Sequence, residues 1–494
     1  MNDPIGTGDR SDRFLCLVKK QHFFSAVTSK NEIPNCNKNR KNGTYSPLYR
    51  LNRYRAERSS DARHKTFGEV VILETFIGVF NFLVFLFFLL LYSYQIVYIG
   101  IGIIKNKKKF KEASKLHHFA FVIAARNESN VIGELIESIK LQKYPKELID
   151  IFVVADNCTD NTAEIARNAG ATVYERFSDV HVGKGYALDF IFNRISTEHA
   201  DKGIEAFLIF DADNVIKDNY VLEMNKAYDA GYEACTSYRN SKNYGTNWIS
   251  AGYSLWFLRE AKFLNNPRFI CGTNCAVSGT GFMVSKRIID MNGGWKYNLL
   301  TEDIEFSVDS AVNHIRIGYV HDAEFFDEQP ETFSQSWKQR MRWAKGFYQV
   351  LWHYGGKLFK GMASKKFGFA CYDMMMNIMP ALILSLFCLT LNTVFLIIGL
   401  VTADSSLVTS TLVSVMHTII SFYGTLFIVG LITTVSEWEK IDCSPAGKIL
   451  YTFTFPIFMF TYVPIAVVAI FKKVGWVPIK HSVTKSIKEL NKQQ

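Results

Sequence analysis

The chain has 494 residues and a formal net charge of +10 at pH 7, and 48% of its residues are hydrophobic. This length exceeds one ordinary domain, and the 40 Phe residues favour membrane segments beside a soluble part. The positive charge is accompanied by no DNA- or RNA-binding motif, so no nucleic-acid partner is expected. The nine cysteines include no CxxC pair, which argues against a zinc site and favours reduced, structural thiols.

A poorly ordered tail and then a membrane anchor are predicted at the start of the chain. Residues 1–68 are polar and show little periodicity, which is typical of a disordered tail. The anchor is expected over residues 69–104, where the stretch 76–104 contains no charged side chain. About 20 apolar residues suffice to cross a bilayer, whereas a signal peptide would be shorter and would lie at the extreme N-terminus.

Lysines beside the anchor indicate its orientation. Six lysines follow the apolar run closely, at positions 105, 107, 108, 109, 111 and 115, whereas Arg63 and Lys65 precede it. Because Lys and Arg mark the cytoplasmic side of a span and attract anionic lipid head groups, the following domain is predicted to be cytoplasmic. This orientation puts the basic N-terminal tail outside, which the charge pattern does not explain.

Residues 115–330 are predicted to form an α/β domain, because short apolar runs alternate there with amphipathic stretches. Buried parallel strands are expected at 119–125, 151–155 and 206–210, with helices at 128–141, 160–169 and 184–194. Repeated strand–helix–strand units imply a right-handed, doubly wound sheet. In such a sheet, ligands lie beyond the carboxyl ends of the strands.

Residues 331–366 are basic and rich in aromatic side chains, which predicts amphipathic helices along the membrane interface. Residues 367–471 are assigned to transmembrane or interfacial helices, with spans at about 375–401 and 407–432. These helices predict a multi-pass protein of the cell membrane that contacts the lipid bilayer.

The last apolar stretch has two open interpretations. Residues 449–471 are interrupted by Pro456 and Pro464 and are followed by a basic tail, 472–494. If the stretch crossed the membrane, this tail would lie outside, against the positive-inside bias. A kinked interfacial or re-entrant segment would keep the tail cytoplasmic, and this interpretation is favoured.

Polar residues follow the expected strands. Glu128 comes after the first strand and can hold the base or ribose of a nucleotide, but Asn127 can equally cap the next helix with Glu128 in its first turn. Asp156 follows the second strand, where a nucleotide would be bound. Lys184 stands between two glycines and offers a cation to a diphosphate, although a lysine in this setting usually belongs to a loop.

Asp211 and Asp213 follow the apolar run 207–210. Strand pleating would put residues i and i+2 on the same side, so both carboxylates can face one point. Mg²⁺ and Mn²⁺ favour carboxylate oxygens and substrate phosphates over a closed protein cage. A chance DxD on a surface is common, but one directly after a buried strand is not. Asp211 and Asp213 are therefore predicted to bind Mg²⁺ or Mn²⁺.

Glu302 and Asp303 open an expected helix over 304–312. Asp303 is the candidate general base, because a carboxylate within hydrogen-bond reach of a sugar hydroxyl can accept its proton. The alternative is structural, since the N-terminal dipole of a helix stabilises a carboxylate there without any chemistry.

Gln339, Arg342 and Trp343 fall at i, i+3 and i+4, so they share one helical face. Gln and Arg can hydrogen-bond hydroxyls or phosphate, and Trp provides a flat surface for a sugar ring. A basic helix on a membrane surface would also contain Arg and Trp, so the structural alternative stays open.

Together these motifs resemble the cellulose-synthase-like, processive members of family 2 glycosyltransferases, which include cellulose, chitin and hyaluronan synthases. The resemblance covers about residues 115–350 well and the membrane segments less specifically. Four motifs occur in the family's order: Asp156, Asp211-Ala212-Asp213, Thr301-Glu302-Asp303 and the QxxRW motif of residues 339–343.

The resemblance implies a GT-A fold, a UDP-sugar donor and a metal-bound diphosphate. It implies that Asp303 is the base and that Gln339, Arg342 and Trp343 lie near the diphosphate and the acceptor, with Glu302 in the same substrate site. Gly279 and Thr280 look like part of the turn that lines the acceptor site. Residues 476–485 look, more loosely, like a gating loop over the nucleotide, with a spacing that departs from the usual pattern.

The expected function is the inverting transfer of sugar from UDP-glucose or UDP-GlcNAc to a growing β-linked polysaccharide. The product would be extruded across the membrane as capsule or exopolysaccharide. Two alternatives remain: a non-processive transferase that adds one sugar to a lipid carrier, and a transporter or scaffold with an inactive transferase-like domain. Whether the chain forms a homo-oligomer is open.

Overall fold

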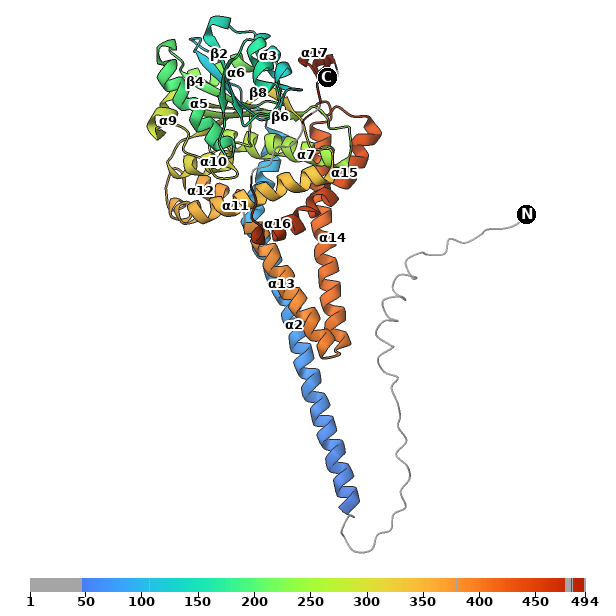
Figure 1. Cartoon of the computed structure of the whole chain (residues 1–494). Coiled ribbons are helices and arrows are strands. Elements are labelled where there is room, and N and C mark those ends of the chain that lie inside the picture. Colours follow the sequence, from blue (N-terminus) through green and yellow to red (C-terminus); the bar gives the residue numbers. More distant parts are fainter. Residues whose placement is uncertain (1–46, 106, 379, 476–480, 482, 493–494) are drawn as a thin grey trace, which may run out of the picture. The chain divides into compact units, whose positions relative to one another are not determined.

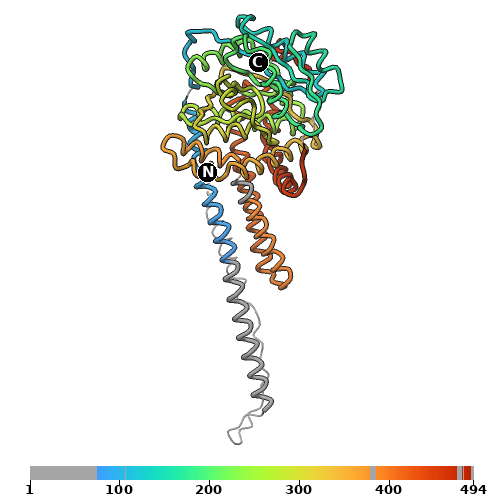
Figure 2. Tube along the Cα trace, turned by 60° about the vertical axis from the view of Figure 1, so that its left-hand side comes forward, coloured from blue at the N-terminus to red at the C-terminus, as the bar shows by residue number. Residues whose placement is uncertain are grey.

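The computed structural model describes residues 47–105, 107–378, 380–475, 481 and 483–492, without side chains at 47–74, 380–384 and 491–492. Residues 1–46 of the expected tail (1–68) and residues 476–480 of the expected gating loop lie outside the described residues. An α/β domain and a set of long helices make up the described part from residue 70 onward (Figures 1 and 2).

One eight-stranded sheet organises the domain, in the order β3-β2-β1-β4-β7-β6-β8-β5. The strands are β1 (Phe119–Ala125), β2 (Ile149–Asp156), β3 (Thr172–Arg176), β4 (Ala206–Asp211), β5 (Val215–Ile216), β6 (Ala234–Ser241), β7 (Phe282–Ser285) and β8 (Ile317–Asp327). The three expected strands pair in parallel, as predicted. Beyond β4 the sheet is mixed, because β7 runs antiparallel to β4 and β6, so the doubly wound parallel arrangement expected from the first strands does not extend across the whole sheet.

Two apolar cores cover the two faces of this sheet, because alternate residues of each strand point to opposite sides. In β1, Ala120 and Val122 join one core, and Phe119, Phe121 and Ile123 join the other. The domain helices are α3 (Ile132–Lys140), α4 (Thr162–Asn168), α5 (Lys184–Glu198), α6 (Tyr220–Asp229), α7 (Trp248–Glu260), α8 (Asn266–Ile270), α9 (Lys286–Asn292) and α10 (Glu302–Val312). The helix expected from residue 128 begins only at Ile132, because Glu128 and Val131 form a turn first.

The remaining helices are α2 (Pro47–Ile104), α11 (Phe333–Gly361), α12 (Gly368–Ile378), α13 (Pro380–Val401), α14 (Ser405–Ser436), α15 (Pro445–Phe460), α16 (Tyr462–Phe471) and α17 (Ile487–Lys492). Thr75–Ile104, Ser405–Ser436 and Pro445–Phe471 are long and apolar enough to cross a membrane. α2 starts at Pro47 rather than near residue 69, so part of the expected tail is helical.

Two of the expected membrane segments are divided. The span expected over 375–401 consists of the end of α12 and then α13. The stretch 449–471 contains Pro456 inside α15 and breaks at Thr461, where α16 begins. This break agrees with a kinked segment, and its position in the membrane stays a prediction.

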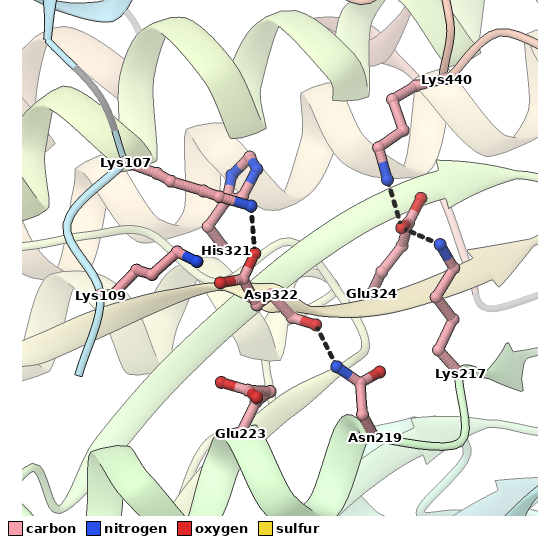
Figure 3. Close-up of a pocket in the computed structure, with 9 residues that line it drawn as sticks. All are labelled: Lys107, Lys109, Lys217, Asn219, Glu223, His321, Asp322, Glu324 and Lys440. Atoms are coloured by element: carbon pink, nitrogen blue, oxygen red, sulfur yellow. Dashed lines mark hydrogen bonds and ion pairs between the residues drawn. The ribbon is translucent and has the colours of Figure 1, made fainter. Parts of the chain in front are cut away.

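Ion pairs join lysines from three different segments to β8 (Figure 3). Lys107 pairs with Asp322 of β8, and Lys217 and Lys440 both lie 2.6 Å from a carboxylate oxygen of Glu324. These residues line a cavity of about 320 Å³. The segments that contain Lys107, Lys217 and Lys440 are distant in sequence and are all fixed to β8 in this way.

Candidate active site

The carboxyl ends of β2, β1 and β4 meet at one edge of the sheet. Asp156 ends β2, is buried and forms an ion pair with Arg176 of β3. Burial raises the pKa of Asp156, and Arg176 opposes this rise. Because β1 lies between β2 and β4, the strands that end in Asp156 and Asp211 are two strand spacings apart, about 10 Å.

Two asparagines shape the loops at this edge. Asn127 and Asn157 have φ values of 58° and 52°, a left-handed conformation that Asn tolerates better than most residues. The Asn127 side chain accepts a hydrogen bond from the Thr159 backbone N–H at 2.7 Å. The Asn127 side chain therefore holds the first two strand–helix loops together, in place of the helix cap considered for this residue.

Glu128 lies in the first of these loops and contacts the C-terminal segment. Its carboxylate oxygens are 3.0 and 3.1 Å from Nδ1 of His481. Burial raises the pKa of Glu128 to about 7. Although burial opposes the charge of His481, the carboxylates of Asp213 and Glu128 raise its pKa to about 10. His481, which belongs only to the loose gating-loop match, thus faces the candidate site.

Asp211 is held by Lys184 at the start of α5. The Lys184 Nζ donates to Asp211 Oδ1 and also to the Gly279 carbonyl, at 2.8 Å. Lys184 therefore links the end of β4 to the turn that precedes β7. The Asp211 backbone N–H donates to the Thr280 hydroxyl at 2.9 Å, which fixes the same turn a second time.

Asp213 lies in a different setting from Asp211. β4 ends at Asp211, and Asp213 follows in a turn, so the strand-pleat argument for the pair is wrong. Asp213 is buried, and its Oδ2 accepts a hydrogen bond from the Glu328 backbone N–H at 3.0 Å. Both aspartates nevertheless act electrostatically on Glu128 and on Arg239, so they belong to one charged region.

The donor set at these two residues fits a hard divalent cation. Among the residues that the structure describes, no group of three or more His, Cys, Asp or Glu side chains could enclose a metal. Mg²⁺ is usually held by one or two carboxylates together with substrate phosphates, and Asp211 and Asp213 supply such a half-built site. The Nζ of Lys242 is buried, has no hydrogen-bond partner in the part of the chain that the structure describes, and interacts electrostatically with Asp213.

The turn before β7 brings backbone close to the acidic residues. Gly279 and Gly281 have φ values of 81° and 66°, and a Cβ at Gly281 would lie 2.1 Å from the Phe325 ring, so only glycine fits there. A Cβ built at Gly279 would lie 4.0 Å from Asp303 Oδ2. The turn therefore reaches both Lys184 and Asp303.

Glu302 and Asp303 begin α10, as the sequence predicts. Burial raises the pKa of both carboxyl groups, to about 7 for Glu302, and the cations Lys184 and Arg342 oppose the rise in each. These two cations come from α5 and α11, so three helices meet at Asp303. A carboxylate with a raised pKa beside a close backbone turn suits proton transfer.

We expect Glu302→Gln to flatten the pH dependence of stability. A folded-state pKa above the unfolded value of 4.5 stabilises the fold below the unfolded pKa, and this contribution is lost as the pH rises through about 7. Gln cannot release a proton. The melting temperature of the variant should therefore fall less than that of the wild type between about pH 5 and pH 8. If the melting temperatures of the two proteins in detergent changed equally with pH, the raised pKa of Glu302 would be contradicted.

The QxxRW residues lie on α11. Arg342 donates to the Leu300 carbonyl at 3.1 Å, and the Trp343 ring contacts those of Tyr253 and Phe257 at centroid distances of 5.6 and 6.2 Å. Oε1 of Gln339 is buried and has no hydrogen-bond partner among the described residues. Arg342 therefore fixes the segment before Asp303, and Trp343 belongs to an aromatic cluster next to it.

Two basic residues of this site carry no sequence motif. Arg239 of β6 donates to Asp327 and, at 2.8 Å, to the Ser278 carbonyl, so it joins the end of β8 to the turn before β7. Arg176 pairs with Asp156, as described above. Neither residue follows an apolar strand run, so the pattern that located the aspartates could not find them.

Comparison with known proteins agrees with this geometry. Residues 117–346 match the family profile described as "Glycosyltransferase like family 2". A poly-beta-1,6-N-acetyl-D-glucosamine synthase of Staphylococcus aureus (strain MSSA476) is 25% identical over 264 residues, which cover 53% of this chain and 61% of the synthase. A probable glycosyltransferase YdaM of Bacillus subtilis (strain 168) is 24% identical over 278 residues, covering 52% and 61%. The match thus spans less than two thirds of these relatives.

Among solved structures, a mannosyltransferase PcManGT from Pyrobaculum calidifontis in complex with GDP-Man and Mn²⁺ is similar, with a TM-score of 0.47 and 13% identity, covering 81% of this chain and 98% of that one. Staphylococcus aureus TarS in complex with UDP-GlcNAc has a TM-score of 0.38 and 14% identity, covering 70% and 91%. Residues 117–346 thus form a domain that matches the family 2 glycosyltransferase profile and has an α/β fold with a mixed sheet.

Proposed function

We propose that this chain transfers sugar from a UDP-sugar, with inversion and with a divalent cation, to a growing β-linked polysaccharide. One observation carries the proposal: the Lys184 Nζ joins Asp211 to the Gly279 carbonyl, and Asp303 lies against the same turn. The charged pair of Lys184 and Asp211, which would face the donor diphosphate, and the candidate base Asp303 are thereby both held at the turn that contains Gly279. The bound cation would be Mg²⁺ or Mn²⁺ at Asp211 and Asp213.

The proposed reaction is a single in-line displacement. Asp303 accepts the proton of an acceptor hydroxyl as that oxygen forms a bond to the anomeric carbon and the bond to the diphosphate breaks. Lys184 and Arg342 stabilise the negative charge of the leaving diphosphate. The cation, when bound, offsets further charge on that diphosphate. Glu128 and Asp156 would hold the nucleoside, and Trp343 would present its ring to the acceptor.

The apolar helices support a membrane setting for this reaction. Three segments reach membrane-spanning length, and the lysines after α2 favour a cytoplasmic catalytic domain in a multi-pass protein. A polymer made beside these helices can leave the cytoplasm through the cell membrane as it grows. UDP-GlcNAc is the first donor to test, because a relative is named as a synthase of poly-N-acetylglucosamine, and UDP-glucose is the second.

The test is incorporation of label by membranes that contain the full chain. Membranes would be incubated with Mn²⁺ and labelled UDP-GlcNAc, UDP-glucose or GDP-mannose, and the products sized on a gel. We expect a long product from one UDP-sugar. A product of one added sugar on a lipid would support the non-processive alternative, and absence of any UDP release would refute the enzyme assignment.

We expect Asp213→Ala to weaken Mn²⁺-dependent binding of UDP about tenfold or more, because the change removes a buried carboxylate from the cation site. Calorimetry of UDP binding with Mn²⁺ and with EDTA would measure this. Asp290→Ala, at an exposed site on α9, serves as the control. Unchanged metal dependence in the Asp213 variant would count against its role as a ligand.

A further inference from the structure

Lys242 is a buried lysine that the proposed reaction does not use. It directly follows β6 and is fully buried. Its backbone N–H donates to the Asp327 carbonyl, and its own carbonyl accepts from the Lys485 Nζ, each at 2.8 Å. In contrast, its Nζ has no hydrogen-bond partner in the described part of the chain. Burying an ammonium group without a hydrogen-bond acceptor is unfavourable in free energy. A functional role would explain why a lysine stands at this position.

Hydrogen bonds place Lys242 next to Asp213. Lys242 donates its backbone N–H to the Asp327 carbonyl, and the residue after Asp327, Glu328, donates its backbone N–H to Asp213 Oδ2 at 3.0 Å. The carboxylates whose charges act on Lys242 are those of Asp213, Glu328, Asp327 and Glu134. Burial lowers the pKa of Lys242, and these four carboxylates oppose the lowering. Conversely, the cations whose charges act on Asp213 are His481, Lys242 and Arg239. Three basic side chains thus act on Asp213, although none of them makes a direct ion pair with it in the residues described.

We propose that Lys242 is a positioning residue that makes a divalent cation and a nucleoside diphosphate bind together at Asp213. The proposal rests on the function proposed above. A cation arriving alone would be repelled by the buried ammonium group, because like charges interact strongly where water is excluded. A diphosphate brings negative charge that offsets the positive charge of the cation and that of the Lys242 ammonium group. Lys242 therefore weakens binding of the bare cation and strengthens binding of the cation–diphosphate pair.

This role predicts a change in thermodynamic coupling. Each of two ligands changes the affinity of the other by the same factor, so one set of Mn²⁺ titrations reports it. Full-length protein in detergent would be titrated with Mn²⁺, with and without UDP, and free Mn²⁺ followed by electron paramagnetic resonance. In Lys242→Met we expect Mn²⁺ alone to bind about tenfold more tightly, and the strengthening by UDP to fall about tenfold.

Matched variants separate this role from a structural one. Lys242→Arg keeps the charge and should keep the wild-type coupling. Lys448→Met removes another buried lysine, whose Nζ donates to the Trp438 carbonyl at 2.7 Å, and should leave both Mn²⁺ affinities unchanged. A purely structural role for Lys242 would weaken Mn²⁺ binding rather than tighten it. If the Met variant does not fold, Lys242→Gln is measured in its place.

The outcomes distinguish this inference from the proposed function. If the wild type binds no Mn²⁺ even with UDP, the metal-dependent function fails. If the wild type shows coupling and the neutral variants keep it, or bind Mn²⁺ alone more weakly, the role of Lys242 is overturned and the proposed function stands.

Discussion

Asp303→Asn is expected to lower the turnover number for sugar transfer by about 10²–10⁴-fold, the usual contribution of a general base. The amide cannot accept the proton of the acceptor hydroxyl, while the size of the side chain stays nearly the same. UDP binding should survive, because Lys184, Asp211 and Asp213 are unchanged. Initial rates with labelled UDP-sugar and calorimetry of UDP binding measure the two effects separately.

A second aspartate of the same helix controls for Asp303. Asp309 is also buried, and its Oδ2 accepts from the Tyr297 hydroxyl and from the Lys296 Nζ, each at 2.9 Å. Asp309→Asn should keep transfer within about threefold of the wild type, since no step of the proposed reaction needs its charge. Equal loss of UDP binding and of transfer in the Asp303 variant would argue against a base and for a structural role of this carboxylate.

The sequence predicted the first half of the sheet better than the second, for a physical reason. The runs 119–125 and 206–210 are apolar without interruption, because both faces of β1 and β4 are buried. β6 is half polar and shows no such run. Its Ser237 hydroxyl donates to the Gly281 carbonyl, and its Tyr238 hydroxyl donates to Glu437, 199 positions away. Contacts between distant segments satisfy these side chains, and no local pattern reports them.

The candidate site divides in the same way. Asp156 and Asp211 could be predicted because each follows a buried strand, and Asp303 because it opens a helix. Arg239 and His481 could not, because each is placed by a distant partner. Arg239 binds Asp327, 88 positions away, and His481 contacts Glu128, 353 positions away. Asp156 and Asp211 lie at the ends of strands, which a sequence pattern can locate. Arg239 and His481 are brought to the site by contacts between distant segments, which no local pattern reveals.

The second large effect concerns the junction between α2 and the domain. Arg268 of α8 and Asp373 of α12 are fully buried, and the guanidinium donates to both carboxylate oxygens at 2.8 and 2.7 Å. Asp373 also accepts from the hydroxyls of Tyr94 and Tyr98 in α2, at 3.1 and 3.0 Å. One carboxylate therefore joins three helices.

Arg268→Met is expected to cost about 3–5 kcal/mol of folding free energy, because it leaves the Asp373 charge buried without a cation. The denaturant midpoint of the full chain in detergent measures this loss. Arg194→Met removes an exposed pair with Glu198 and should cost less than about 1 kcal/mol. The double variant Arg268→Met with Asp373→Leu should recover part of the loss, since it removes the uncompensated charge. If the double variant were less stable than the sum of the two single changes, packing rather than charge would govern the junction.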